Sequence, residues 1–264
     1  MSALRQAVRE GRKLEGVLIV DAHCHMGRWF NFHIPHCDAG GMVEVMDSLG
    51  VSVACPAAHL SIGPDHIGGN TMVLKAMQDH PGRFCPYATI NPNYPEEIEG
   101  ELNRCKDAGM RLIKLHPSMH KYPADGENSR IVYEFAARNG FPVLLHTWKG
   151  DSNCAPALFE KLAAEYPRVN FLLGHSGGGY EGVQESIRVA KQRPNVFLET
   201  CYSGRFWGRI EMMVHAVGAD RVIWGSDFPF LDASAALGEV VYAKISDGDA
   251  EKVLGRNMAA LLGL

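Results

Sequence analysis

The amino-acid sequence predicts an α/β fold in which eight parallel strands close into a (β/α)8 barrel, the TIM barrel, preceded by a short helix. Eight apolar segments of strand length alternate with segments of helical periodicity. The chain has 264 residues, close to the length of about 250 typical of such barrels. Polar residues of chemical interest stand at the ends of the apolar segments, where a barrel builds its site. A doubly wound open sheet is the alternative. No linker interrupts the pattern, so one domain is expected over residues 1–264.

Each expected element has a local signal. Ser2 to Gly11 predicts the N-terminal helix with Ser2 as its cap, placed across the barrel bottom. The expected strands are Val17–His25, Val51–Ala57, Phe84–Ile90, Met110–His116, Pro142–His146, Val169–His175, Asn195–Thr200 and Arg221–Asp227. The expected helices between them are Met42–Leu49, Asn70–His80, Pro95–Ala108, Ser129–Asn139, Pro156–Tyr166, Gly182–Gln192 and Arg209–Val217, with more helices after the last strand. Pro86 is awkward in the third strand because it lacks a backbone N–H. Segments 26–41, 59–69 and 117–128 are expected to be loops.

The first strand carries the most specific motif. Residues 17–20 are apolar and β-prone, and Asp21, His23 and His25 follow at alternate positions. Because successive side chains of a strand point to opposite faces, these three are expected to share one face. Neutral imidazole is the commonest protein ligand of zinc and of the neighbouring transition metals. The His-x-His pair therefore predicts a metal site rather than two buried core histidines.

Further donors close later strands. His146, His175 and Asp227 stand at the ends of the fifth, sixth and eighth expected strands. In a barrel they converge with His23 and His25 at the mouth. Four imidazoles and a carboxylate suit zinc, manganese or iron, and one ion needs only three or four of them.

Lys114 is the ambiguous polar residue of the fourth strand, one step below His116. An inward lysine is costly unless it is paired. It either forms a carbamate with carbon dioxide and bridges a second ion, or stays protonated and pairs with Asp227 or with substrate.

Composition excludes several functional classes. The chain has 26 Lys and Arg against 30 Asp and Glu, a formal charge of −4, so no nucleic-acid partner is expected. No Gly-x-Gly-x-x-Gly follows the first strand, which argues against dinucleotide binding. The 7 cysteines form no Cys-x-x-Cys pair and are expected to be reduced thiols. Without a signal peptide or an apolar run of about 18 residues, a soluble cytoplasmic protein with no membrane partner is expected.

Taken jointly, these motifs resemble those of the amidohydrolase superfamily, and more narrowly its amidohydrolase-related branch of hydrolases, lactonases and nonoxidative decarboxylases. The similar segments are Asp21-Ala-His-Cys-His25, Lys114-Leu-His-Pro117, His146, Gly174-His-Ser-Gly-Gly178 and Gly225-Ser-Asp-Phe-Pro229. The resemblance implies one or two divalent metal ions, zinc first, with manganese or iron possible. The ligands it implies are His23, His25, Lys114, His146, His175 and Asp227. In two-metal relatives a fourth-strand lysine is carboxylated, and in one-metal relatives the sixth-strand histidine activates water.

The expected reaction is hydrolysis of a C–N or C–O bond in a small amide, lactam or lactone by metal-activated water. Asp227 is the expected general base, and His175 is expected to orient the water or to stabilise the oxyanion. The alternative is nonoxidative decarboxylation of an aromatic or muconate-type acid by the same metal cage. A third interpretation is a barrel that has lost activity and serves as a binding module.

Several residues near the mouth have two interpretations. Trp29 and Phe30 either bury themselves or contact substrate. Four cationic residues either hold a substrate carboxylate or are solvated surface charges, namely Arg28, Lys149, Arg205 and Arg209. The expected partners are a small-molecule substrate and further copies of the same chain in a homo-oligomer.

Overall fold

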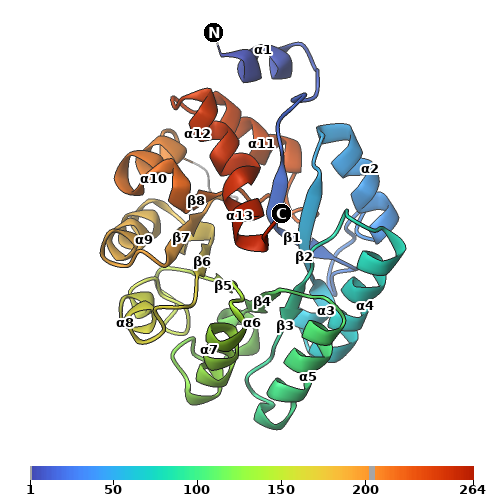
Figure 1. Ribbon diagram of the computed structural model, residues 1–264, viewed down its shortest axis with the longest axis vertical. Coiled ribbons are helices and arrows are strands. Elements are labelled where there is room, and N and C mark those ends of the chain that lie inside the picture. Colours follow the sequence, from blue (N-terminus) through green and yellow to red (C-terminus); the bar gives the residue numbers. More distant parts are fainter. Residues whose placement is uncertain (1, 202–205) are drawn as a thin grey trace.

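A computed structural model describes residues 2–201 and 206–264, and its eight strands form a parallel barrel surrounded by helices (Figure 1). The strands are β1 (Val20–Met26), β2 (Val53–Ala58), β3 (Tyr87–Thr89), β4 (Leu112–Leu115), β5 (Val143–His146), β6 (Phe171–Gly174), β7 (Val196–Glu199) and β8 (Val222–Ile223). β1 pairs with β2, and β3 to β8 pair in chain order. The strands are shorter than expected, and β3 begins only after Pro86, which has no N–H to donate.

Backbone hydrogen bonds join the two sheets into a closed ring. Between β2 and β3, the N–H of Ala54 donates to Arg83 O and the N–H of Cys85 donates to Ala54 O, both at 2.9 Å. Beyond β8, the N–H of Ala22 in β1 donates to Trp224 O at 3.1 Å. An open doubly wound sheet has no such bonds between its outer strands. The (β/α)8 barrel expected from the sequence is therefore confirmed.

The helices follow the expected alternation. They are α1 (Ala3–Arg9), α2 (Ala39–Leu49), α3 (His59–Ile62), α4 (His66–Asp79), α5 (Pro95–Asp107), α6 (Pro117–His120), α7 (Glu127–Asn139), α8 (Leu158–Glu165), α9 (Tyr180–Gln192), α10 (Arg209–Val217), α11 (Ala233–Tyr242), α12 (Asp247–Glu251) and α13 (Asn257–Leu262), with short turns η1 (His175–Gly177), η2 (Ala219–Arg221) and η3 (Lys252–Arg256). The short helices α3 and α6 lie in segments expected to be loops. α2 starts earlier than expected because the Asp38 side chain accepts the N–H of Gly41 at 2.8 Å. None of the described helices has the length and apolar character required to cross a bilayer.

Side-chain alternation along each strand separates an inner core from an outer one. On β4, Ile113 and Leu115 belong to the large cluster that also contains the helices, whereas Leu112 belongs to a smaller cluster inside the ring. Lys114 follows Leu112 on the inner face. The inner cluster consists of Val20, Ala22, Cys55, Ala57, Tyr87, Leu112, Leu144, Leu172, Ile223, Met258 and Ala259. These side chains fill the barrel below the polar residues of the mouth.

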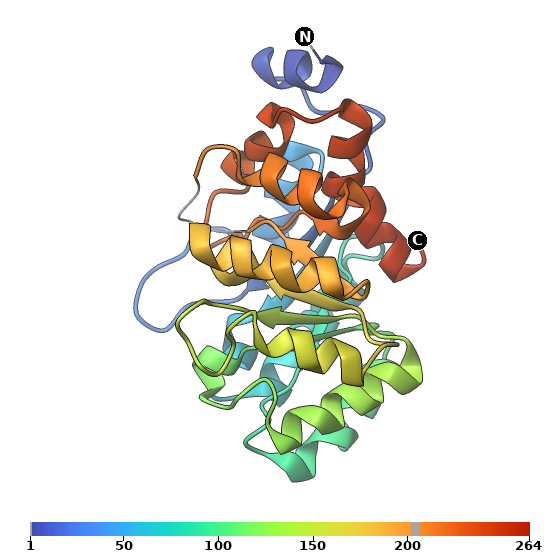
Figure 2. The same cartoon turned by 90° about the vertical axis from the view of Figure 1, so that its left-hand side faces the viewer.

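The C-terminal helix, not the N-terminal one, covers the barrel bottom. Met258 and Ala259 of α13 belong to the inner cluster, and α13 lies at the opposite end of the barrel from the long segment that follows β1 (Figure 2). Ser2 caps α1 as expected, but α1 lies at the periphery, where Arg5 donates to Val241 O at 3.1 Å. The expectation for α1 was wrong because α13 already buries the apolar interior.

Candidate metal centre

The six predicted ligands all lie at the carboxyl ends of strands. His23 and His25 are in β1, Lys114 is in β4, and His146 is the last residue of β5. His175 directly follows β6, and Asp227 lies beyond β8 on the segment that bonds to β1. The barrel therefore brings residues far apart in sequence to one mouth, as expected.

His23, His25 and Asp227 form the closest group. Asp227 Oδ1 lies 3.2 Å from His25 Nε2 and 3.9 Å from His23 Nε2, and one donor atom of each residue lies within 4.8 Å of the others. Burial alone would raise the pKa of Asp227, but the neighbouring imidazoles of His25, His175 and His23 hold that pKa below its usual range. Asp227 is therefore an ionised carboxylate.

The contacts of His25 test whether this group fits a metal. Its Nδ1 lies 3.2 Å from Ala57 O, and because a carbonyl only accepts, Nδ1 carries the proton. In the neutral ring, Nε2 then presents a lone pair to Asp227 Oδ1. Two acceptors that face each other are satisfied by a cation between them, so the residues fit a divalent metal.

Lys114 is fully buried and contacts His23 rather than Asp227. Its Nζ lies 2.9 Å from Nε2 of His23. Burial lowers the pKa of Lys114 to about 8, despite the opposing charges of nearby acids. A lysine with this pKa has a substantial neutral fraction just above neutral pH, which carbamate formation requires.

His146 stands beside the close group, not within it. Its ring stacks on His116 with centroids 4.2 Å apart and lies 4.6 Å from the ring of His175. Burial lowers the pKa of His146, so the ring is neutral. Its Nδ1 is buried without a hydrogen-bond partner among the described residues. A buried ring nitrogen without a partner is available to a metal ion.

Asp21 does not share the face of the two histidines, contrary to expectation. The register of β1 against β2 shifts between Asp21 and Cys24, a bulge that breaks the alternation. The Asp21 carboxylate instead accepts the backbone N–H groups of His23 at 3.1 Å and Ser226 at 3.0 Å. It therefore ties β1 to the segment that carries Asp227.

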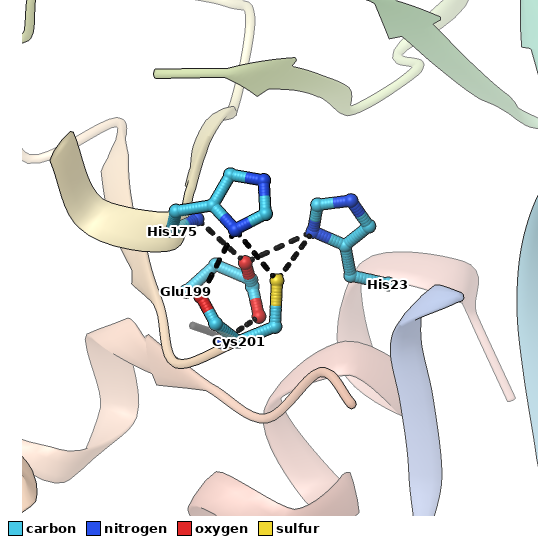
Figure 3. A group of neighbouring side chains, drawn as sticks. All are labelled: His23, His175, Glu199 and Cys201. Atoms are coloured by element: carbon cyan, nitrogen blue, oxygen red, sulfur yellow. Dashed lines mark hydrogen bonds and ion pairs between the residues drawn. The ribbon is translucent and has the colours of Figure 1, made fainter. Parts of the chain in front are cut away.

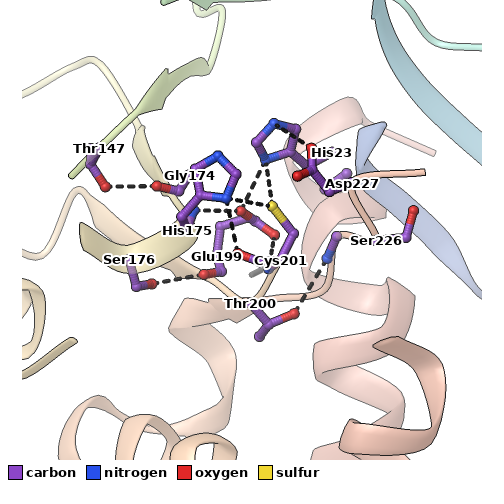
Figure 4. Close-up of polar contacts among 12 residues, drawn as sticks. His23, Thr147, Gly174, His175, Ser176, Glu199, Thr200, Cys201, Ser226 and Asp227 are labelled. Carbon is purple, nitrogen blue, oxygen red and sulfur yellow. Dashed lines mark hydrogen bonds and ion pairs between the residues drawn. The ribbon is translucent and has the colours of Figure 1, made fainter. Parts of the chain in front are cut away.

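His175 is held in a left-handed backbone conformation, which residues other than glycine rarely adopt. Its φ is 63° and that of Ser176 is 44°. Ser176 Oγ donates to Glu199 O at 2.8 Å, and Thr147 Oγ1 donates to Gly174 O at 2.7 Å (Figure 4). His175 Nδ1 lies 3.1 Å from the carbonyl of Cys201, which leaves Nε2 free for the cavity.

A cavity of about 430 Å³ opens above these residues. It is lined by His25, Trp29, Ile62, His116, Ser118, Met119, His146, Trp148, His175, Asp227, Phe230 and Leu231. Trp29 thus lines the cavity, whereas Phe30 is 78% exposed. The wall is mostly aromatic and apolar, as small-molecule sites commonly are.

The four cationic candidates are not among the described lining residues of this cavity. Arg209 is buried and pairs with Glu239 at 2.7 Å, so it is structural. Lys149 faces Glu181 at 3.8 Å, and Arg28 is exposed in a neighbouring groove. Arg205 lies outside the described residues.

Three site residues were not singled out from the sequence. His59 stacks on His25 with centroids 5.1 Å apart and is fixed by Gly27 O at 2.6 Å from its Nδ1. Glu199, the last residue of β7, lies 3.0 Å from His23 Nδ1, and Cys201 Sγ lies 3.0 Å from the same atom (Figure 3). An acid at the end of the seventh strand, in phase with the other polar residues, was the signal for Glu199. Nothing comparable distinguishes His59 from the other histidines in the segments that were expected to be loops.

Comparisons with known proteins concern the family and the fold of the chain. A family model described as Amidohydrolase matches residues 20–264. An uncharacterised TIM-barrel protein from Bordetella bronchiseptica has 19% identity and a TM-score of 0.77, covering 94% of this chain and 99% of that one. A 2,6-dihydroxybenzoate decarboxylase from Rhizobium has 18% identity and a TM-score of 0.71, covering 94% and 99%. A manganese complex of 5-carboxyvanillate decarboxylase from Novosphingobium aromaticivorans has 15% identity and a TM-score of 0.75, covering 95% and 97%.

The structural likenesses concern the fold, whereas the family match spans nearly all of the barrel and every predicted ligand. The chain belongs to the amidohydrolase family.

Proposed function

We propose that the protein is a metal-dependent hydrolase that cleaves a C–N or C–O bond in a small amide, lactam or lactone. The observation that carries the proposal is the close group of His23, His25 and Asp227 beneath an aromatic-walled cavity. The family match supports metal-dependent chemistry. Zinc, a cytoplasmic location and a homo-oligomeric state are further parts of the proposal.

His23, His25 and Asp227 would hold the metal, with His146, His175 and Lys114 as the remaining candidates. A bound divalent ion supplies Lewis acidity and lowers the pKa of water to about 7. The neutral imidazoles suit such an ion, because burial lowers the pKa of His23 well below its usual value and that of His175 to about 4. No proton has to leave these rings before a cation enters.

Asp227 is the proposed general base. Its carboxylate is ionised and faces the cavity, so it is able to take a proton from the attacking water and return it to the leaving group. His175 is the proposed orienting group. Because its Nδ1 proton points to Cys201 O, the neutral ring offers Nε2 as an acceptor. This geometry supports positioning of water and does not support the alternative role of oxyanion donor.

Nonoxidative decarboxylation of an aromatic or muconate-type acid is the second candidate. Trp29, Trp148 and Phe230 give the cavity flat walls that suit a planar ring. The Rhizobium and Novosphingobium structures described above are decarboxylases, and the latter holds manganese. Against this candidate, the described lining has no lysine or arginine to hold a carboxylate.

One experiment separates the two reactions. Metal-free protein is reconstituted with zinc or manganese and offered panels of lactones, amides and hydroxybenzoic acids in water labelled with oxygen-18. A hydrolase incorporates the label into its product, whereas a decarboxylase releases carbon dioxide and takes up a solvent proton on carbon. Carbon dioxide release without label in the organic product would reject hydrolysis. Failure to bind a stoichiometric metal would reject both reactions.

A further inference from the structure

The end of β7 carries a carboxylate that the proposed chemistry does not use. Glu199 is fully buried, and its oxygens accept the backbone N–H groups of His175 at 2.9 Å and of Cys201. The same carboxylate lies 3.0 Å from Nδ1 of His23 (Figure 3). A buried anion held by donors on both oxygens has little freedom to move. It is therefore able to fix the orientation of the ring it contacts.

The opposite nitrogen of the same ring faces a cation. Lys114 Nζ lies 2.9 Å from Nε2 of His23, and an ammonium group only donates hydrogen bonds. Nε2 therefore accepts, and the single proton of the neutral ring lies on Nδ1, where it is donated to Glu199. Lys114, His23 and Glu199 thus form a linear chain of hydrogen bonds, in which one tautomer satisfies both neighbours.

Two glycines leave room for this contact. A Cβ on Gly225 would lie 2.4 Å from Glu199 Oε1 and 2.6 Å from His23 Cβ. A Cβ on Gly174 would lie 3.2 Å from Cε1 of His23. Both are inward positions at the ends of β8 and β6, where the alternation would otherwise place a side chain. The neighbouring strands are therefore built around the paired ring and carboxylate.

A second metal ion is an alternative use of the same atoms. His23, His175, Glu199 and Cys201 each place one donor atom within 4.8 Å of the others (Figure 4). However, both carboxylate oxygens already accept backbone N–H groups, and Nδ1 of His23 cannot hold a proton and a metal together. Hydrogen bonding accounts for the group better than a metal does.

We propose that Glu199 is a positioning residue for the candidate metal centre, holding His23 as the Nδ1–H tautomer so that the Nε2 lone pair, which accepts from Lys114 in this structure, is available to a metal. This inference rests on the metal-dependent function proposed above. Carboxylates that orient a ligating histidine typically change metal affinity by about 10–100-fold. Glu199→Gln should weaken zinc binding by about this factor, because the amide NH2 must face a backbone N–H or the Nδ1 proton.

The test uses metal-free full-length protein. Zinc affinity is measured by chelator competition in the wild type, in Glu199→Gln and in the control Glu101→Gln. Glu101 is also a buried glutamate in a hydrogen-bond network, bonded to Asn70 and Arg104, but it lies outside the site. Its substitution should leave zinc affinity within about twofold of the wild type.

A second measurement does not depend on any variant. Nitrogen-15 NMR of histidine-labelled, metal-free protein reports which ring nitrogen carries the proton, and the Nδ1–H form is expected for His23. Finding the Nε2–H form, or equal zinc affinity in Glu199→Gln and the wild type, would overturn the proposal. So would a thiolate charge-transfer band with cobalt that Cys201→Ser removes. If the wild type binds no metal, the proposed function fails, while NMR still reports the tautomer by itself.

Discussion

At the residue scale, Asp227 combines a restricted backbone with an ionised side chain. Its φ is 62°, and its carboxylate lies 3.2 Å from His25 Nε2. Asp227→Asn keeps the shape of the side chain and removes the proposed general base, so kcat should fall by about 10²–10⁴-fold. Much of the metal should remain, because His23 and His25 are unchanged. Steady-state kinetics and metal analysis check both parts, with the exposed Asp79→Asn as control. Near-normal kcat in Asp227→Asn would contradict its assignment as base.

Lys114 illustrates a residue whose presence costs stability. Its pKa falls from 10.5 to about 8 in the folded chain, which corresponds to a cost of about 3 kcal/mol for the charged form. Lys114→Met also loses about 1 kcal/mol from the hydrogen bond to His23. We therefore expect the variant to be more stable than the wild type by about 2 kcal/mol at pH 7, measured by urea unfolding.

The stability difference between Lys114→Met and the wild type should depend on pH with a definite sign. Between pH 8 and pH 10.5 the unfolded chain binds more protons at Lys114 than the folded chain, so the wild type gains stability as the pH rises. The advantage of Lys114→Met should be full below pH 8 and shrink above it. If the difference in the free energy of unfolding between Lys114→Met and the wild type stayed constant up to pH 10, Lys114 would not be buried as an ammonium group.

At the scale of elements, the exit of β8 depends on Gly225. An alanine there would place its Cβ against Glu199 and His23, which calls for movement in a packed interior. Gly225→Ala should lower the free energy of unfolding by about 1–3 kcal/mol. Gly238→Ala in α11 meets no atom within 4 Å and should instead raise it by about 0.5–1 kcal/mol. Denaturant unfolding of both variants checks the opposite signs. If Gly225→Ala and Gly238→Ala changed the free energy of unfolding equally, the exit of β8 would have to relax around the added methyl group.

The element order was predictable, and so were the ends of seven strands to within one residue, whereas the end of β8 and local irregularities were not. His146 and His175 mark abrupt ends of apolar runs, which sequence alone displays. The bulge after Asp21 depends on pairing with β2 and has no local signature. The four-residue helix α3, which begins at His59, is too short for a helical period to show. Glu199 was predictable from its position at the end of the seventh strand, where the other strands also carry polar residues. Its contact with His23 could not be predicted, because it depends on closure of the barrel.

At the scale of the molecule, the barrel tolerates extensive sequence change while it keeps one mouth. Identities of 15–19% accompany TM-scores of 0.75–0.77 in two of the solved structures. An inner core that follows strand alternation constrains volume and polarity more than residue identity, so similar folds persist at low identity. The residues that set chemistry stand at strand ends, where substitutions change the site without disturbing the ring.

The seam between β8 and β1 is where a metal should stabilise the whole barrel. His25 N donates to Phe228 O at 2.7 Å, and Asp227 N donates to His23 O at 2.8 Å, so candidate ligands lie on both sides of the seam. A ligand that binds only the folded state at 100 times its Kd adds about 2.7 kcal/mol. Zinc should therefore raise Tm, and hydrogen exchange at residues 22–25 and 226–228 should slow most.

His25→Ala should lose most of the increase in Tm caused by zinc, because it removes a candidate ligand on the β1 side of the seam. The exposed His215→Ala should keep this increase. Scanning calorimetry with and without a chelator measures the shift, and mass spectrometry locates the slowed exchange. If zinc raised Tm equally in His25→Ala, the ion would be binding elsewhere on the molecule. The seam joins the last strand of the barrel to the first. An ion bound there would therefore stabilise the closed barrel and also supply the metal for the proposed reaction.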